Sequence, residues 1–126
     1  MAKQPLLTEK DNLFENLRTW LLQLPGVSEA PHRFGGTEFQ LEGVEFMHSH
    51  GHSFLDIRLS KEDQSAVLKT GEALPHRFAP QAGWVSLRMT NPEYLVAAKK
   101  IVQLAYENAK KNLREIATRR TQKKLS

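Results

Sequence analysis

The sequence predicts an α+β domain, a two-layer sandwich whose antiparallel four-stranded sheet carries its helices on one face, in the order α-β-β-β-α-β-α. Apolar residues recur at helical spacing near both ends of the chain and alternate with period two in its middle. Turn-forming residues separate these segments. Because 126 residues fit one domain with one core, we expect a single folded unit.

The first helix is predicted from Leu13 to Leu24, where apolar residues lie three or four positions apart. Thr8 followed by Asp11 resembles a capping box and marks its start. Pro25-Gly26 ends it, because proline cannot continue the hydrogen-bond ladder and glycine accepts the turn that follows. We expect residues 27–36 to form a loop.

A three-strand meander is predicted over residues 37–59, where apolar residues occupy alternate positions. Glu42-Gly43 and Gly51-His52 are predicted as two-residue hairpin turns. The first turn pairs Leu41 with Val44, Phe39 with Phe46 and Thr37 with His48. The second pairs His50 with Ser53, His48 with Leu55 and Phe46 with Ile57. Both turns place the apolar alternates on one buried face.

The second half of the chain supplies two helices and a strand. Ser60 with Asp63 is predicted to cap a short helix that Gly71 ends. Residues 83–89 read as the fourth strand, and Asn91-Pro92 begins a long last helix. We expect residues 1–118 to form the domain and residues 119–126 to be a basic, frayed tail.

All five histidines fall between residues 32 and 76, and the tetrapeptide Pro-His-Arg-Phe occurs there twice. Imidazole titrates near neutral pH and is the commonest metal ligand, so this crowding marks a candidate site. In the predicted register His48 and His50 share the parity of Phe46, so they are expected to point towards the helices. The candidate ligand-binding residues are His48, His50, His76, His32, Arg33 and Arg77.

A metal ion is one candidate occupant, and it must use nitrogen and oxygen ligands because the chain has no cysteine. His48 and His50 can bind zinc if a third ligand joins them. His76, His32 and Asp56 are available, and His76 is preferred because Asp56 has the wrong parity in the predicted register. Arg33 and Arg77 would form an anion clamp if both face the histidines.

Two other interpretations of the histidines stay open: a polar pocket without metal, and side chains that only pack. The chain contains no H-E-x-x-H metal motif, no P-loop and no G-x-G-x-x-G, so neither a reaction nor a nucleotide cofactor is indicated. The predicted function is therefore a histidine-lined pocket for a small ligand, including an anionic one, or for a metal ion such as zinc. Ligand identity, catalysis and oligomeric state are left open.

Charge is uneven along the chain, with 9 Lys/Arg and 11 Asp/Glu in residues 1–90 but 9 and 3 in residues 91–126. The alternative function is an interaction module that uses the basic last helix, with histidines that only pack. The body offers no basic face to extend a nucleic-acid contact, so nucleic acid is not the expected partner. With no signal peptide and no apolar run near the ~20 residues of a membrane span, we expect a cytoplasmic protein and no membrane contact.

A series of short motifs resembles the family labelled "luciferase domain" over residues 20–106. The motifs are Leu24-Pro25-Gly26-Val27, Pro31-His32-Arg33-Phe34-Gly35-Gly36, Glu38-Phe39, Glu45-Phe46-Met47-His48-Ser49-His50-Gly51, Leu55-Asp56-Ile57, Gly71-Glu72-Ala73 with His76, and Gly83-Trp84-Val85-Ser86. The label implies light emission, and the matching positions include four of the candidate histidines. The Leu-Pro-Gly-Val start and the element order are also similar to MmcQ/YjbR-like proteins, which implies a related α+β fold.

Overall fold

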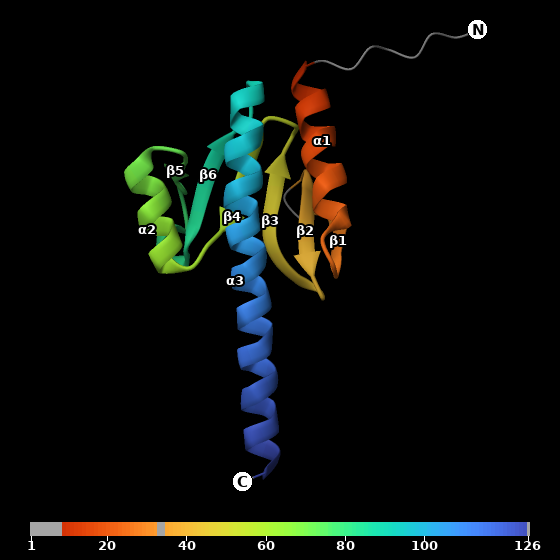
Figure 1. Ribbon diagram of the computed structural model, residues 1–126, viewed down its shortest axis with the longest axis vertical. Coiled ribbons are helices and arrows are strands. Elements are labelled where there is room, and N and C mark those ends of the chain that lie inside the picture. Colours follow the sequence, from red (N-terminus) through yellow and green to blue (C-terminus); the bar gives the residue numbers. More distant parts are fainter. Residues whose placement is uncertain (1–8, 33–34, 126) are drawn as a thin grey trace, which may run out of the picture.

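The computed structural model describes residues 9–32 and 35–125, and Figure 1 shows them as one sheet with helices on one face. In these ranges the helices are α1 (Glu9–Gln23), α2 (Lys61–Thr70) and α3 (Pro92–Leu125), with a 3-10 turn η1 (Pro80–Ala82). The strands are β1 (Val27–Pro31), β2 (Thr37–Leu41), β3 (Val44–His50), β4 (Phe54–Arg58), β5 (Leu74–Pro75) and β6 (Trp84–Arg88).

The α+β class and the antiparallel sheet are confirmed, but the expected four strands are wrong because the described sheet has six, in the order β1-β2-β3-β4-β6-β5. The segment expected to be a loop contains β1, which pairs from Val27 opposite Leu41 to Pro31 opposite Thr37. A proline is tolerated there because β1 is an edge strand. The other unexpected strand, β5, lies at the opposite edge of the sheet and has only two residues, too few to show an alternating pattern in the sequence.

The core lies between the sheet and the helices. Leu17 and Leu21 of α1, and Ile101 and Val102 of α3, are fully buried. Figure 1 shows α1 and α3 side by side across the same face of the sheet. The Tyr106 hydroxyl of α3 donates to the Pro25 carbonyl at 2.6 Å, which ties this helix to the end of α1. Within residues 9–32 and 35–125, the helices therefore cover one face of the sheet and leave the other face without a helix.

The predicted ends of α2 are confirmed. The Ser60 hydroxyl accepts a hydrogen bond from the Asp63 backbone N–H at 3.1 Å, and Gly71 ends the helix with a φ of 75°. The cap predicted at Thr8 lies outside the described residues. Within the described ranges, none of the helices combines the length and the apolar character that crossing a bilayer requires.

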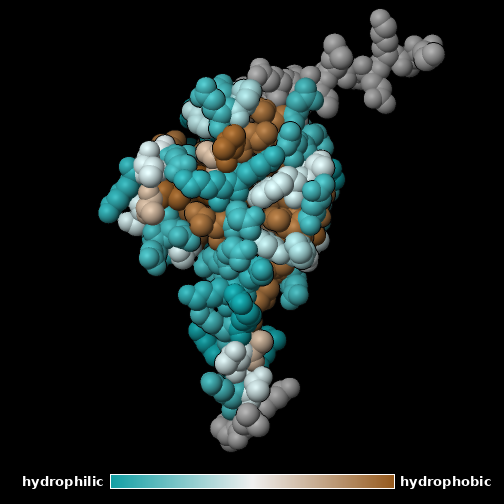
Figure 2. All heavy atoms as spheres, viewed as in Figure 1, coloured by the Kyte–Doolittle hydropathy of each residue, from teal (hydrophilic) through white to brown (hydrophobic). Residues whose placement is uncertain are grey.

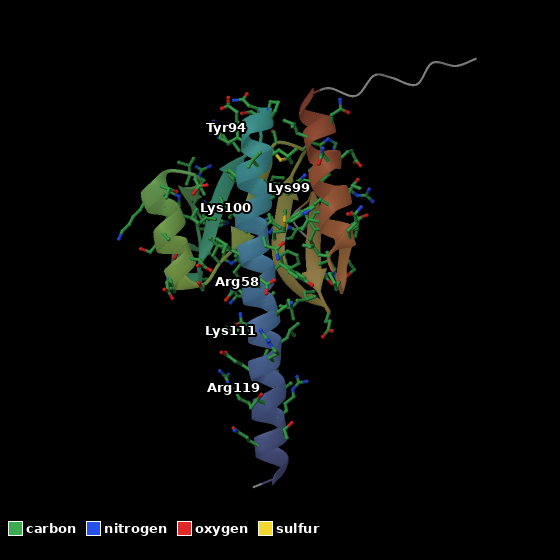
Figure 3. All side chains as sticks on the ribbon, viewed as in Figure 1. Arg58, Tyr94, Lys99, Lys100, Lys111 and Arg119 are labelled. Carbon is green, nitrogen blue, oxygen red and sulfur yellow. The ribbon has the colours of Figure 1, made fainter. Side chains whose placement is uncertain are left out.

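The helix α3 runs on well past the sheet. We expected the chain to fray from residue 119, but the helix continues through Leu125. Residues 119–125 are mostly good helix formers. Figure 2 shows this protruding half as mostly hydrophilic on the side in view. Lys111 and Arg119 extend from it in Figure 3.

The pairing of β3 departs from the predicted register by one residue. The turn at Glu42-Gly43 is confirmed by the pair Leu41 and Val44, and Gln40 then lies opposite Glu45. A bulge follows, so Phe39 lies opposite Met47 and Thr37 opposite Ser49. The physical reason is that two successive apolar residues, Phe46 and Met47, are both buried, which a regular alternation does not allow.

The second hairpin is also longer than predicted. His50 pairs with Phe54, so three residues rather than two form the connection, and His48 lies opposite Asp56 rather than Leu55. Ser49 lies opposite Leu55 and is 1% exposed, so it points into the core. Because neighbours along a strand alternate, His48 and His50 face the side of the sheet that carries no helix.

Gly36 holds the connection between β1 and β2 against β3. It has a φ of 81°, and a β-carbon placed on it would lie 1.8 Å from the Ser49 carbonyl oxygen. Gly35, beside it, has a φ of 93° and nothing within 4 Å of the same position. Any larger residue at Gly36 must therefore move the backbone between His48 and His50.

We expect Gly36→Ala to destabilise the protein more than Gly35→Ala. Both changes carry the roughly 1–2 kcal/mol cost of a left-handed backbone, but only the first also displaces a strand carbonyl. Urea unfolding of the two variants and the parent measures the difference. Equal losses of unfolding free energy would show that β3 does not hold Gly36 in place.

Candidate functional site

A pocket of about 760 Å³ opens on the helix-free face of the sheet, behind the view in Figure 1. Strands β3, β4 and β6 form its floor, and the segment from His76 to Ala79 and the end of β1 border it. Its lining residues are His32, Glu45, His48, His50, Phe54, Asp56, His76, Arg77, Phe78, Ala79, Trp84 and Ser86. This is where the chain gathers most of its histidines.

Three side chains meet at the floor of the pocket. The Asp56 Oδ2 atom lies 3.0 Å from His48 Nε2 and 2.8 Å from His50 Nε2. The two imidazole Nε2 atoms are 3.1 Å apart. These two nitrogens and one oxygen come from β3 and β4. His48 of β3 pairs with Asp56 of β4, and His50 lies two residues further along β3. The backbone register of a single hairpin thus fixes their geometry.

The Asp56 carboxylate has two further partners, one at each oxygen. Ser86 of β6, directly opposite Asp56, donates its hydroxyl to Oδ1 at 2.7 Å. His76 Nε2 lies 3.4 Å from Oδ2. Asp56 is 3% exposed and Ser86 is 4% exposed. A buried carboxylate needs such partners, because leaving it unpaired away from water is costly.

His48 is held from its other side by Glu45. Its Nδ1 atom lies 2.6 Å from Glu45 Oε1, so Nδ1–H donates to this carboxylate. The His32 ring stacks on the His48 ring with centroids 4.1 Å apart, and His32 Nε2 is 3.5 Å from the same Glu45 oxygen. The bulge in β3 is what brings Glu45 and His48 within reach of each other.

His76 makes a different set of contacts. Its Nδ1 atom accepts backbone N–H groups from Phe78 at 3.0 Å and from Ala79 at 2.9 Å. Because Nδ1 acts as an acceptor, the ring carries its proton on Nε2, and this N–H points to Asp56. His76 therefore links the segment bearing Arg77 and Phe78 to the buried carboxylate.

The pKa shifts in the cluster follow from these contacts. Burial lowers the pKa of His48, but hydrogen bonds to Asp56 and Glu45 outweigh it and raise the pKa above its ordinary value. Burial raises the pKa of Asp56, but hydrogen bonds from His48, Ser86 and His50 outweigh it and hold the pKa well below its usual range. In the absence of a metal ion, the two carboxylates therefore favour the protonated form of His48, and His48 favours the ionised form of Asp56.

Two groups of described residues have the geometry to hold a metal ion. One is His48, His50 and Asp56, and the other is His32, Glu45 and His48; in each, the ligand atoms all lie within 4.8 Å of one another. The groups share His48. If Nδ1 of His48 donates its proton to Glu45, only Nε2 remains as a ligand atom, which favours the first group.

The structure corrects two expectations about orientation. His48 and His50 were predicted to point towards the helices, and they face the opposite side because the bulge shifts β3 by one residue. Asp56 was set aside for its parity, and the same shift places it on the side of both imidazoles. His76, expected near them on its loop, does lie within 3.4 Å of Asp56.

The remaining candidates are placed as follows. His32, 9% exposed, lies beside His48 at the end of β1. Arg77 lines the pocket, with its guanidinium carbon 5.9 Å from the centre of the Phe78 ring. Arg33 lies outside the described residues, so the clamp predicted from two arginines stays a prediction.

Several lining residues are not predicted from the sequence. Glu45 and Ser86 carried no signal beyond a polar residue in a strand, and their role depends on the pairing across the sheet. Trp84 has the parity opposite to the apolar set of β6, which was visible in the sequence, but its place beside His48 and His76 was not. A register that included the bulge at Phe46-Met47 would have placed Asp56 on the same face as His48 and His50.

Comparison with known families agrees with the resemblance seen in the sequence. The family described as Luciferase domain matches residues 43–105. The matched segment includes His48, His50, Asp56, His76 and Ser86, whereas His32 precedes it. No curated protein matches the chain.

In the metal-free protein, we expect the parent to have a larger free energy of unfolding than His48→Gln, and we expect this difference to shrink as pH rises. The folded-state pKa is raised above the unfolded value of 6.5, so the contribution is complete below about pH 6.5 and is lost as pH rises through the folded pKa. Asp56 stays ionised throughout, because its pKa is lowered. Urea unfolding of the parent and His48→Gln in EDTA, from about pH 5.5 to 9, measures this. A difference that does not vary with pH would contradict the ion pair.

Proposed function

Because the chain belongs to the Luciferase domain family, whose match covers the strands that build the pocket, we propose that it binds a divalent metal ion through His48, His50 and Asp56. With three protein ligands, such an ion would have room for water or for a small ligand from the pocket that these residues line. The observation that carries the proposal is the convergence of two imidazole nitrogens and one carboxylate oxygen within 3.1 Å of each other.

The hydrogen bonds of His48 leave its Nε2 atom available to a metal ion. Glu45 accepts the Nδ1 proton of His48, so Nε2 of a neutral His48 ring presents a lone pair. That lone pair faces a carboxylate oxygen of Asp56 and the Nε2 atom of His50. These three atoms can meet only with a hydrogen or a cation between them: the Nε2–H of a neutral His50, an added proton on His48, or a metal ion that displaces both.

The distances suit a metal ion after a small movement. Bonds of about 2.0–2.2 Å to a tetrahedral zinc ion separate its ligand atoms by roughly 3.3–3.6 Å. The three atoms here are 2.8 to 3.1 Å apart, so each side chain needs to open by a few tenths of an ångström. The hydrogen bond from His48 to Glu45 matches the carboxylate–histidine–metal arrangement that orients metal-binding imidazoles.

Asp56, rather than His76, is the third ligand in this proposal. The Nε2 atom of His76 carries the proton, because its Nδ1 atom accepts two backbone N–H groups. Binding a metal through Nε2 would require the ring to lose that proton as well. His76 and Ser86 instead orient the Asp56 carboxylate from outside the ligand set.

Two imidazoles and one carboxylate fit several divalent ions. Zinc accepts this donor set with one position left for water or substrate, and iron(II) accepts the same set with more open positions. An ion here would act as a Lewis acid on a bound ligand. The residues of this chain would hold the ion and orient the ligand, and His50, whose side chain is 42% exposed, lies on the open side of the site.

We expect protein purified without a histidine tag and dialysed against zinc to retain about one ion per chain, and His50→Gln and Asp56→Asn to retain none. His52→Gln is the matched control, since His52 stacks on Phe14 of α1, outside the pocket. Competition with a zinc-binding dye should give an affinity more than about 100-fold weaker for the two ligand variants. The same titration with iron(II) under anaerobic conditions identifies the preferred ion.

The variant His76→Asn tests whether His76 binds the metal ion itself or only orients the Asp56 carboxylate. The asparagine oxygen can replace Nδ1 as the acceptor for Phe78 and Ala79, while the contact with Asp56 is lost. A positioning role predicts zinc affinity weakened by about 10- to 100-fold with one ion still bound. Equal zinc content in the parent, His50→Gln and Asp56→Asn would refute the metal site.

A further inference from the structure

The walls of the pocket above the proposed metal site are aromatic. The Trp84 ring lies 5.3 Å from the His48 ring and 6.0 Å from the His76 ring, and the Phe54 ring lies 6.0 Å from the His50 ring. Phe78 completes the wall and is 82% exposed, although it belongs to a residue type that is usually covered. These rings offer flat apolar surface to an organic molecule rather than to an ion alone.

Arg77 supplies a positive charge on the same wall. Among the described residues it forms no ion pair with a carboxylate, and its guanidinium lies over the Phe78 ring. The acidic residues of the lining are both engaged elsewhere, Glu45 by His48 and Asp56 by Ser86 and the two strand imidazoles. Arg77 is therefore available to an anionic group that enters the pocket.

The charges of the described lining residues add up in favour of an anion. Glu45 and Asp56 each contribute one negative charge, Arg77 contributes one positive charge, and a divalent ion contributes two. With neutral imidazoles, the loaded pocket carries one positive charge in excess. A ligand with a single negative charge neutralises it, whereas a cation would add to it.

We propose that this pocket binds an organic monocarboxylate with a flat apolar body, whose carboxylate lies on the side of the metal ion and Arg77 and whose body lies against Trp84, Phe54 and Phe78. The inference rests on the proposed metal site for part of its positive charge. The volume of about 760 Å³ lies within the range of pockets that enclose small organic ligands. The aromatic wall selects the body of the ligand, and the positive charges select its head.

The test uses 2-naphthoate and its uncharged analogue 2-naphthamide, each titrated by calorimetry into zinc-loaded full-length protein. We expect the carboxylate to bind at least about tenfold more tightly than the amide. Arg77→Gln should weaken naphthoate at least about tenfold without changing naphthamide affinity or zinc content. Arg119→Gln removes the same charge from the protruding end of α3, far from the pocket, and should bind naphthoate as the parent does (Figure 3).

The possible outcomes distinguish a failure of the carboxylate pocket from a failure of the metal site. Zinc binding without naphthoate binding, equal affinity for the two probes, or equal affinity of Arg77→Gln and Arg119→Gln would overturn the carboxylate pocket and leave the metal site standing. Protein that takes up no zinc but binds naphthoate in an Arg77-dependent manner would overturn the metal site and uphold the carboxylate pocket. Trp84→Leu should weaken both probes alike, since it removes wall surface and no charge.

Discussion

The buried carboxylate of Asp56 is the constraint on which the site depends. It lies on β4 in the middle of the sheet, 3% exposed, in a place where an unpaired charge would destabilise the fold. His48 and His50 approach it from β3, Ser86 from β6, and His76 from the connection before η1. Its partners thus come from both neighbouring strands and from a loop, which makes the pocket floor part of the fold itself.

One irregularity in the sheet makes this arrangement available. The bulge at Phe46-Met47 buries two successive apolar side chains and turns the rest of β3 by one position. Without it His48 and His50 would enter the core, where the helices already fill the space. With it, they share a face with Asp56 and with Trp84, and the helix-free side of the sheet gains a polar floor with aromatic walls.

The sequence predicted the elements that depend on local chemistry and missed those that depend on pairing. The α+β class, the caps of α2 at Ser60 and Gly71 and the turn at Glu42-Gly43 follow from short-range rules and are confirmed. The register of β3 fails because the bulge replaces simple alternation, and that one residue also decides whether Asp56 joins the histidines. Strand β1 has no apolar alternation to reveal it, since it is an edge strand held by backbone pairing.

In the proposed site, a metal ion lies between His48, His50 and Asp56 in place of their direct hydrogen bonds. Crystals grown from zinc-loaded protein, with diffraction recorded on both sides of the zinc absorption edge, measure this most directly. We expect an anomalous peak about 2.0–2.2 Å from His48 Nε2, His50 Nε2 and Asp56 Oδ2, with His76 remaining outside the ligand set. A peak bound by His76 Nε2, or the three side chains still in direct hydrogen-bond contact with no peak between them, would contradict it.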